Sequence, residues 1–72
     1  MGKPIQVPGL PEKLVAAREA AGLTRLLAAE KSGVHHVSIA RFETGRRMPT
    51  IMTLYRLAAA YGVRPGDLLQ QQ

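Results

Sequence analysis

Glycine residues divide this chain of 72 residues into segments that are long enough only for short helices. They stand at Gly22, Gly33, Gly45 and Gly62, and each follows a stretch whose apolar residues recur at helical spacing. A glycine just beyond a helix commonly ends it, because glycine adopts the left-handed backbone conformation without steric cost. No stretch alternates between apolar and polar residues as a β-strand does, so the sequence predicts an all-α fold.

Residues that favour helix starts precede several of these stretches and set the expected boundaries. Pro11 is a favoured first helical residue, and Thr24 and Thr50 are good N-caps. Pro65 opens a final turn or short helix, in which Leu68 and Leu69 are expected to face inward. The other four helices are expected over residues 11–21, 25–32, 36–44 and 51–61. Along the first of them, the apolar stripe consists of Leu14, Ala17 and Ala20.

Residues 1–10 are expected to form an N-terminal arm before a single domain of residues 11–70, because Pro4, Pro8 and Gly9 break any regular element. Three apolar residues of the arm have no apparent place in a five-helix core: Ile5, Val7 and Leu10. Leu26 and Leu27 likewise point away from the apolar face of the second helix. Two hypotheses follow. The arm covers these leucines, within the chain or across a dimer, or the second helix rotates and buries Leu27.

The net charge of +5 is concentrated in one region, since residues 25–56 alone carry +4. Such a balance favours a polyanionic partner, either nucleic acid or an acidic membrane surface. The short, capped apolar stripes favour a packed core over a membrane surface, and no apolar run approaches the ~20 residues of a membrane span. The absence of cysteine excludes disulfides and fits a reducing, cytoplasmic compartment.

The segment SGVHHVSIARFETGRR, residues 32–47, contains the helix that is most informative about function. At 100° per residue, Ser38, Ile39 and Phe42 share the side that should face the core. The opposite side is low in profile and consists of Val37, Ala40, Arg41 and Thr44, with His36 at its edge. Arg41 suits a bidentate contact to a guanine edge, and Val37 suits contact with a thymine methyl group. A surface helix without a partner explains this face equally well.

Four pieces of the chain together resemble the phage-repressor-like helix-turn-helix family (lambda repressor and Cro, XRE-type). They are AREAAGLT, AAEKSGV, SIARFETGRRMPT and LYRLAAAYGV, followed by DLL, and they cover about residues 14–69. The resemblance implies a compact five-helix lambda-repressor-like domain with the helix-turn-helix in its second and third helices. It also implies a homodimer that binds double-stranded DNA sequence-specifically with the third helix in the major groove, and that regulates transcription as a repressor.

The same resemblance implies roles for individual residues. The positions that read bases are His36, Val37, Ala40 and Arg41. The positions that contact the DNA backbone are Thr24, Arg25, His35, Thr44, Arg46, Arg47 and Thr50. Arg18 and Glu43 match a structural salt bridge, so that Glu43 does not count against DNA binding. The residues expected at a dimer interface are Tyr61, Val63, Leu68 and Leu69. Relatives usually carry glutamine at Arg25 and serine or threonine at His35.

Other functions have weaker support in the sequence. The adjacent pair His35 and His36 does not suit a metal, because neighbouring helical residues point ~100° apart. Ser32 and Ser38 do not form a convincing nucleophile with these histidines, so neither an enzyme nor a cofactor is expected. The alternative that stays open is a protein-interaction module on the same fold, such as an antitoxin-type protein. The basic, low-profile face of the third helix favours DNA over that alternative.

Overall fold

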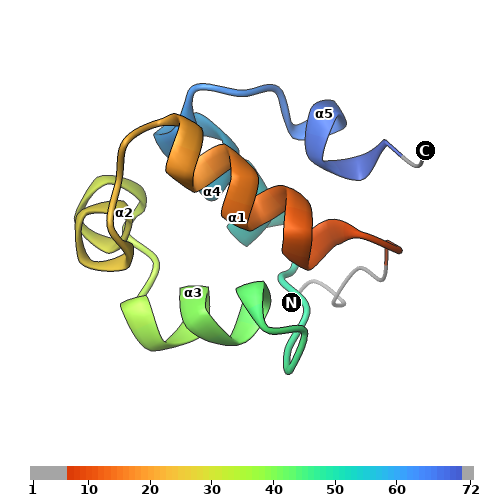
Figure 1. Cartoon of the computed structure of the whole chain (residues 1–72), viewed down its shortest axis with the longest axis horizontal. Coiled ribbons are helices and arrows are strands. Elements are labelled where there is room, and N and C mark those ends of the chain that lie inside the picture. Colours follow the sequence, from red (N-terminus) through yellow and green to blue (C-terminus); the bar gives the residue numbers. More distant parts are fainter. Residues whose placement is uncertain (1–6, 71–72) are drawn as a thin grey trace.

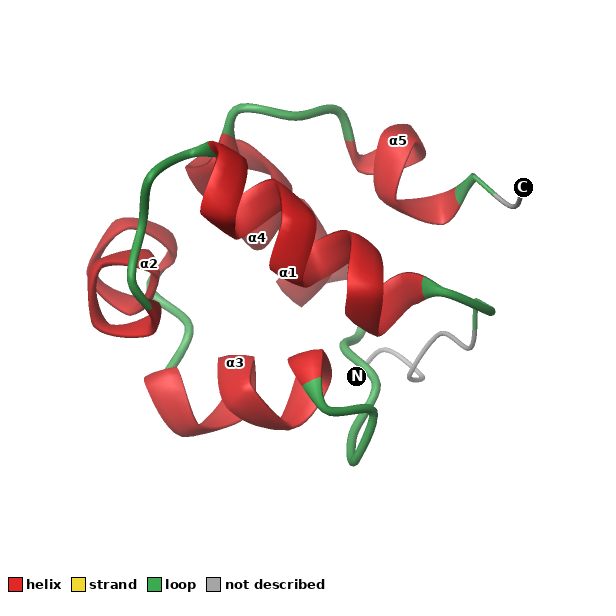
Figure 2. Ribbon diagram, in the orientation of Figure 1, coloured by secondary structure: helices red, strands yellow, loops and turns green. Residues whose placement is uncertain are grey.

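The computed structural model describes residues 7–70, which fold into five helices joined by short turns (Figure 1). The helices are α1 (Leu10–Ala20), α2 (Arg25–Ser32), α3 (His36–Glu43), α4 (Ile51–Tyr61) and α5 (Pro65–Leu69). Within this part of the chain there is no β-strand, as the ribbon coloured by secondary structure shows (Figure 2). The prediction of an all-α, five-helix fold is therefore confirmed.

Side-chain caps fix where the helices begin. The Oγ1 atoms of Thr24 and Thr50 accept hydrogen bonds from the backbone N–H groups of Leu27 and Thr53, at 3.2 and 3.3 Å. Each cap satisfies one of the donors that a helix N-terminus leaves unpaired. Gly33 ends α2 with φ 76°, the left-handed conformation expected of a glycine at this place. Helices α2 and α4 consequently begin and end where the sequence predicted.

Helix α1 begins one residue earlier than predicted, at Leu10, and this changes the picture of the arm. Leu10 is fully buried in the core, and Val7 is half-buried against it. Both residues therefore have a place in the domain, whereas Ile5 lies outside the described residues. The described part of the arm joins α1 at the end of that helix far from α2 (Figure 1). The described residues of the arm lie away from α2, and the hypothesis that the arm covers Leu26 and Leu27, within the chain or across a dimer, stays a prediction.

The core lies between α1 and the four other helices. It is formed by Leu10, Leu14, Ala28, Val34, Ile39, Phe42, Leu54, Leu57, Ala58, Ala60, Tyr61 and Leu68. In Figure 1, α1 crosses in front of α4, while α3 lies below this pair and α2 stands at one end. Full burial of a leucine contributes roughly 1.5–3 kcal/mol, so these few large side chains supply much of the domain's stability. Ala20 is exposed, so the apolar stripe of α1 is shorter than predicted.

Helix α2 contacts the rest of the domain through a small side chain. Ala28 is fully buried, and α2 packs against both α3 and α4. Leu26 and Leu27 stay 62% and 47% exposed, so the hypothesis that a rotation of α2 buries Leu27 is wrong. The reason is that Ala28 already fills the contact between α2 and the core.

Candidate nucleic-acid interface

The turn between α2 and α3 holds these two helices at a fixed angle. Gly33 makes the left-handed bend, and Val34 follows it into the edge of the core. The Oγ of Ser32 accepts a hydrogen bond from the backbone N–H of Val34, at 3.1 Å. A buried side chain and a local hydrogen bond therefore both fix the turn. Helix α3 is presented to the outside by a rigid support and not by a loose connection.

Helix α3 has one buried side and one exposed side. Ile39, Phe42 and Glu43 are buried, whereas Ser38, expected on the core side, is half-buried. The four expected base-reading residues lie on the other side, where His36, Val37 and Arg41 are exposed and Ala40 is half-buried. The structure thus brings these four residues together on one accessible surface of a single helix. Arg41 is the long cation among them, and two of its neighbours are short and apolar.

His35 is the N-cap of α3 and has a defined tautomer. Its Nδ1 atom accepts a hydrogen bond from the backbone N–H of Val37, at 3.1 Å. A neutral imidazole that accepts at Nδ1 carries its proton at Nε2, so the exposed edge of this ring is a hydrogen-bond donor. The ring stacks on that of His36, with centroids 4.6 Å apart and planes 24° apart. His35 thus takes over the capping role that a serine or threonine would have.

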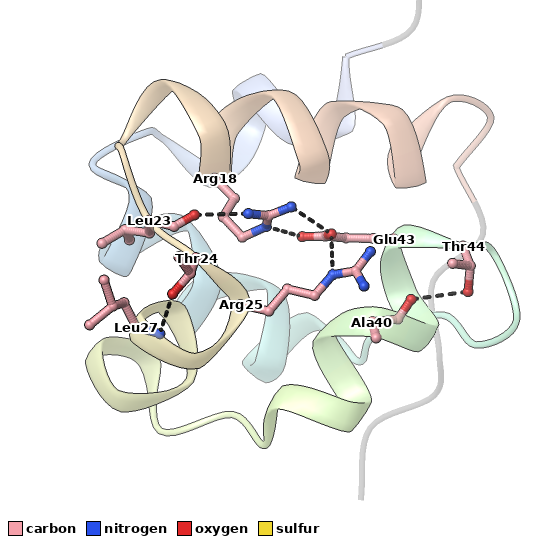
Figure 3. A network of polar contacts seen from close by, with 8 residues as sticks. All are labelled: Arg18, Leu23, Thr24, Arg25, Leu27, Ala40, Glu43 and Thr44. Atoms are coloured by element: carbon pink, nitrogen blue, oxygen red, sulfur yellow. Dashed lines mark hydrogen bonds and ion pairs between the residues drawn. The ribbon is translucent and has the colours of Figure 1, made fainter.

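A buried carboxylate joins α1, α2 and α3 (Figure 3). Arg18 donates to Glu43 through two nitrogens, with Nε–Oε2 at 2.7 Å and Nη2–Oε1 at 3.1 Å. The third nitrogen of Arg18, Nη1, donates to the carbonyl oxygen of Leu23 at 2.8 Å. The hydrogen bond to Glu43 raises the pKa of Arg18 above its ordinary value, although burial opposes this effect. The expected partners Arg18 and Glu43 are therefore in contact, and the Arg18 guanidinium is fully engaged by the fold.

Arg25 is a second cation that contacts this carboxylate. The sequence did not predict this contact. The Nε of Arg25 lies 3.0 Å from Oε1 of Glu43. The side chain of Arg25 is 45% exposed, against 13% for Arg18 and 1% for Glu43. The only signal in the sequence was an arginine where relatives usually carry an uncharged glutamine. The distance of 18 positions along the chain gave no indication that Arg25 would meet Glu43.

The segment after α3 places two more arginines at the surface. Gly45 turns the chain with φ 76°, and the backbone N–H groups of Arg46 and Arg47 both donate to the carbonyl oxygen of Arg41, at 2.9 and 3.3 Å. Both side chains are exposed beside the C-terminal end of α3. The hydroxyl of Thr44 donates to the carbonyl oxygen of Ala40 at 3.0 Å. This segment therefore has a defined backbone close to the exposed face of α3.

The threonines expected at the DNA backbone have structural roles. Thr24 and Thr50 cap helices, as described above, and Thr44 hydrogen-bonds to the last turn of α3. Thr24 and Thr44 are exposed, whereas Thr50 is half-buried and its hydroxyl also contacts that of Thr53 at 3.1 Å. Thr24 and Thr44 therefore keep an accessible hydroxyl oxygen, and Thr50 is the least accessible of the three.

The residues expected at a dimer interface divide into two pairs. Tyr61 and Leu68 are buried in this chain's own core, whereas Val63 and Leu69 are half-buried at its edge. The packing of α5 against α1 and α4 covers Leu68 within the single chain, and the dimer interface itself stays a prediction. Only Val63 and Leu69 of this set have surface left for a second chain.

Neither a metal cluster nor a membrane-spanning helix occurs in the described part of the chain. Residues 7–70 contain no group of three or more histidine, cysteine, aspartate or glutamate side chains that could hold a metal ion. No helix among them is long and apolar enough to cross a membrane. A shallow groove of about 360 Å³ lies beside the turn and is lined by Ala29, Glu30, Gly33, Val34, His35 and His36.

Two helices joined by a tight glycine turn, the second of them exposed and followed by arginines, define a helix-turn-helix protein. Comparison with known proteins agrees, because the model of the helix-turn-helix family matches residues 14–68. The chain therefore belongs to this family. It is also 40% identical over 52 residues to an uncharacterized HTH-type transcriptional regulator, y4dJ, of Sinorhizobium fredii (strain NBRC 101917 / NGR234). That match covers 72% of this chain and 68% of the relative.

Proposed function

We propose that this chain is a sequence-specific, double-stranded-DNA-binding transcriptional regulator that acts as a repressor. The observation that carries the proposal is the exposed side of α3, where Arg41 lies among short side chains on a rigidly supported helix. Membership of the helix-turn-helix family and the likeness to an HTH-type transcriptional regulator support DNA binding and regulation of transcription. They also point to a binding protein and not to an enzyme.

In this proposal α3 enters the major groove, whose width admits a helix. Arg41 donates two hydrogen bonds to a guanine edge, and Val37 contacts a thymine methyl group. Ala40 lets the helix approach closely, and His36 contacts a base from the first turn of α3. The exposed cations Arg46 and Arg47, together with the Nε2 donor of His35, bind phosphates on either side of the groove.

A homodimer follows from the length of α3. Its eight residues span about 12 Å, which is the length of only three or four base pairs of B-form DNA. One such helix cannot distinguish an operator from the many competing sites of a genome, whereas two copies double the sequence that is read. Val63 and Leu69 are the candidates for the contact between the two copies. We place the protein in the cytoplasm, where it has access to DNA.

The proposal is tested by titrating the full chain against fluorescent duplex DNA. A pool of random duplexes should first be enriched for the best binding sequence by repeated selection on the protein. We expect the selected duplex to bind at least a hundredfold more tightly than random duplex at the same salt concentration, since specific sites typically exceed random DNA by 10³ or more. Selection that enriches no sequence, with affinity equal for all duplexes, would contradict sequence-specific regulation.

A protein-interaction module is the second candidate, and exposed apolar side chains favour it. Leu26 and Leu27 on α2, and Met52 and Tyr55 on α4, are about half exposed or more. Scattered apolar residues are common on protein surfaces, so they argue for a partner less strongly than α3 argues for DNA. The titration separates the two functions. A protein-only module would leave the anisotropy of every duplex unchanged at micromolar protein and low salt.

A further inference from the structure

Glu43 has more hydrogen-bond donors around it than the fold requires. Arg18 alone contacts both carboxylate oxygens, with Nε on Oε2 and Nη2 on Oε1. Such a two-point contact already pairs the buried charge and connects α1 to α3. Arg25 adds a further contact to Oε1 from the start of α2. Pairing the charge of Glu43 therefore does not explain why Arg25 contacts it as well.

The charge of the three residues together is positive, and the excess lies on the exposed side. Two guanidinium groups share one carboxylate, so the group carries a net charge of +1. Arg18 and Glu43 are buried, whereas nearly half of the Arg25 side chain remains exposed. The unbalanced charge is thus presented to a partner through Arg25. A phosphate group is the anion that the exposed side of this domain would meet in DNA.

Arg25 uses only one nitrogen for its contact within the protein. Its Nε faces Glu43, and the side chain makes no other hydrogen bond among residues 7–70. In Figure 3 the Arg25 side chain extends from α2 toward Glu43 at the end of α3, and its two terminal nitrogens make no drawn contact. A guanidinium is planar, so a bond at Nε fixes the direction of the edge formed by Nη1 and Nη2. That edge is the fork that matches two phosphate oxygens.

We propose that Glu43 is a positioning residue for DNA binding, which holds the guanidinium of Arg25 so that its Nη1 and Nη2 atoms bind one DNA phosphate. This inference rests on the proposed function. The buried carboxylate restricts the arginine before DNA arrives, so less conformational freedom is lost on binding. The same carboxylate does not repel the phosphate appreciably, because Arg18 already neutralises it. Residue 25 must then be an arginine, because a lysine ammonium has no planar edge that a contact to Glu43 could aim at two oxygens of one phosphate.

The experiment compares arginine-to-lysine and arginine-to-glutamine changes at an anchored and an unanchored site. Arg25 is the anchored site, and Arg47 is the control, because it is exposed and its side chain makes no hydrogen bond or ion pair in the described part of the chain. Affinity for random duplex DNA is measured as a function of salt concentration. Thermal unfolding of each variant is followed by circular dichroism, so that a loss of folded protein is recognised.

We expect R25K to weaken binding about as much as R25Q, by about tenfold, which is the effect of one charge-assisted hydrogen-bonded contact. Both changes should reduce the magnitude of the log–log salt slope by about 0.9 per bound subunit. At the control site, R47K should retain more affinity than R47Q, because an unanchored cation contributes mainly through its charge. If R25K retains wild-type affinity and slope, charge alone suffices and the positioning role is overturned.

Glu43 itself is tested by a double-mutant cycle with Arg25 at a temperature at which all four proteins are folded. E43Q should weaken DNA binding when Arg25 is present and have little further effect in the R25Q background. Equal losses in the two backgrounds would overturn the coupling. If E43Q unfolds the domain, the comparison of R25K with R25Q still decides. A wild-type chain that binds no duplex would overturn the proposed function as well, whereas binding that depends on Arg47 and not on Arg25 overturns this inference alone.

Discussion

Replacing Tyr61 with phenylalanine should remove an instability that the domain has at high pH. Tyr61 is buried at the end of α4, and its hydroxyl has no hydrogen-bond partner within the described part of the chain. Burial raises the pKa of this phenol to about 12, with a further contribution from the negative charge of Glu43 and an opposing one from Arg18. The folded protein therefore holds the neutral phenol more firmly than the unfolded chain does.

The sign and size of the effect follow from the two pKa values. The phenol of an unfolded chain has a pKa of ~10, so it ionises first and stabilises the unfolded state as the pH rises. The stability linked to Tyr61 is fully present below pH ~10 and is lost progressively toward pH ~12. A difference of about 2 units corresponds to about 2.7 kcal/mol in total, of which about 1.4 kcal/mol is lost at pH 11. A domain of this size has roughly 4–11 kcal/mol of stability in all.

Urea unfolding of the wild type and of Tyr61→Phe, measured from pH 7 to pH 11, isolates this contribution. All other titratable groups are common to the two proteins, so the difference between the two free energies of unfolding reports Tyr61 alone. At pH 7 we expect the variant to be as stable as the wild type, because the ring still fills the core and no hydrogen bond is lost. Tyr55→Phe is the matched control, since it removes the hydroxyl of an exposed tyrosine on the same helix. A constant difference between wild type and Tyr61→Phe across this range would refute the reasoning, as would a loss above about 1 kcal/mol at pH 7.

Three further changes test the surface of α3 and its surroundings. Arg41→Ala should cost ~1–3 kcal/mol on the selected duplex and relax the preference at one base position; an equal loss on random duplex would reduce Arg41 to a phosphate contact. His35→Ala should lower the free energy of unfolding by about 1 kcal/mol through loss of the α3 cap, whereas His35→Asn should retain it, and equal urea midpoints for all three proteins would show that the cap contributes nothing. Arg46→Ala should weaken binding to all sequences alike and reduce the magnitude of the salt slope by about 0.9 per bound subunit; an unchanged slope would place Arg46 away from DNA.

The helices could be predicted from the sequence because their signals are local. A threonine before a helix and a glycine after it act within a few residues, and α2 and α4 begin and end where those residues predict. The start of α1 was missed because Gly9 and Pro11 suggested that Leu10 belonged to an arm. In the structure Gly9 takes the N-cap position, and Leu10 enters the core from the first turn of α1. The burial of Leu10 in the core decided where α1 begins, and the residues on either side of Leu10 do not indicate that burial.

The candidate site was predictable only in part, for a related reason. Helical periodicity alone placed Val37, Ala40 and Arg41 on one side of α3, since it requires no knowledge of neighbouring helices. Which side chains of α2 are free depends instead on how α2 packs against α3 and α4. Spacing along the chain therefore did not show that Arg25 contacts Glu43. It also could not decide whether Leu26 and Leu27 stay exposed or whether a rotation of α2 buries Leu27.

An acidic residue beside a DNA-binding helix would ordinarily be expected to weaken binding, and the position of Glu43 explains why it need not. The carboxylate is almost completely buried and touches two arginines, so the nearest charge at the surface is the positive one of Arg25. Removing Arg18 would leave a buried carboxylate with one half-exposed partner, which is costly to the fold. Removing Arg25 would leave the Arg18–Glu43 pair intact and take away only the exposed cation. Replacement of Arg18 should therefore first reduce the stability of the fold, whereas replacement of Arg25 should first reduce the affinity for DNA. The two outcomes differ although both side chains bind the same carboxylate.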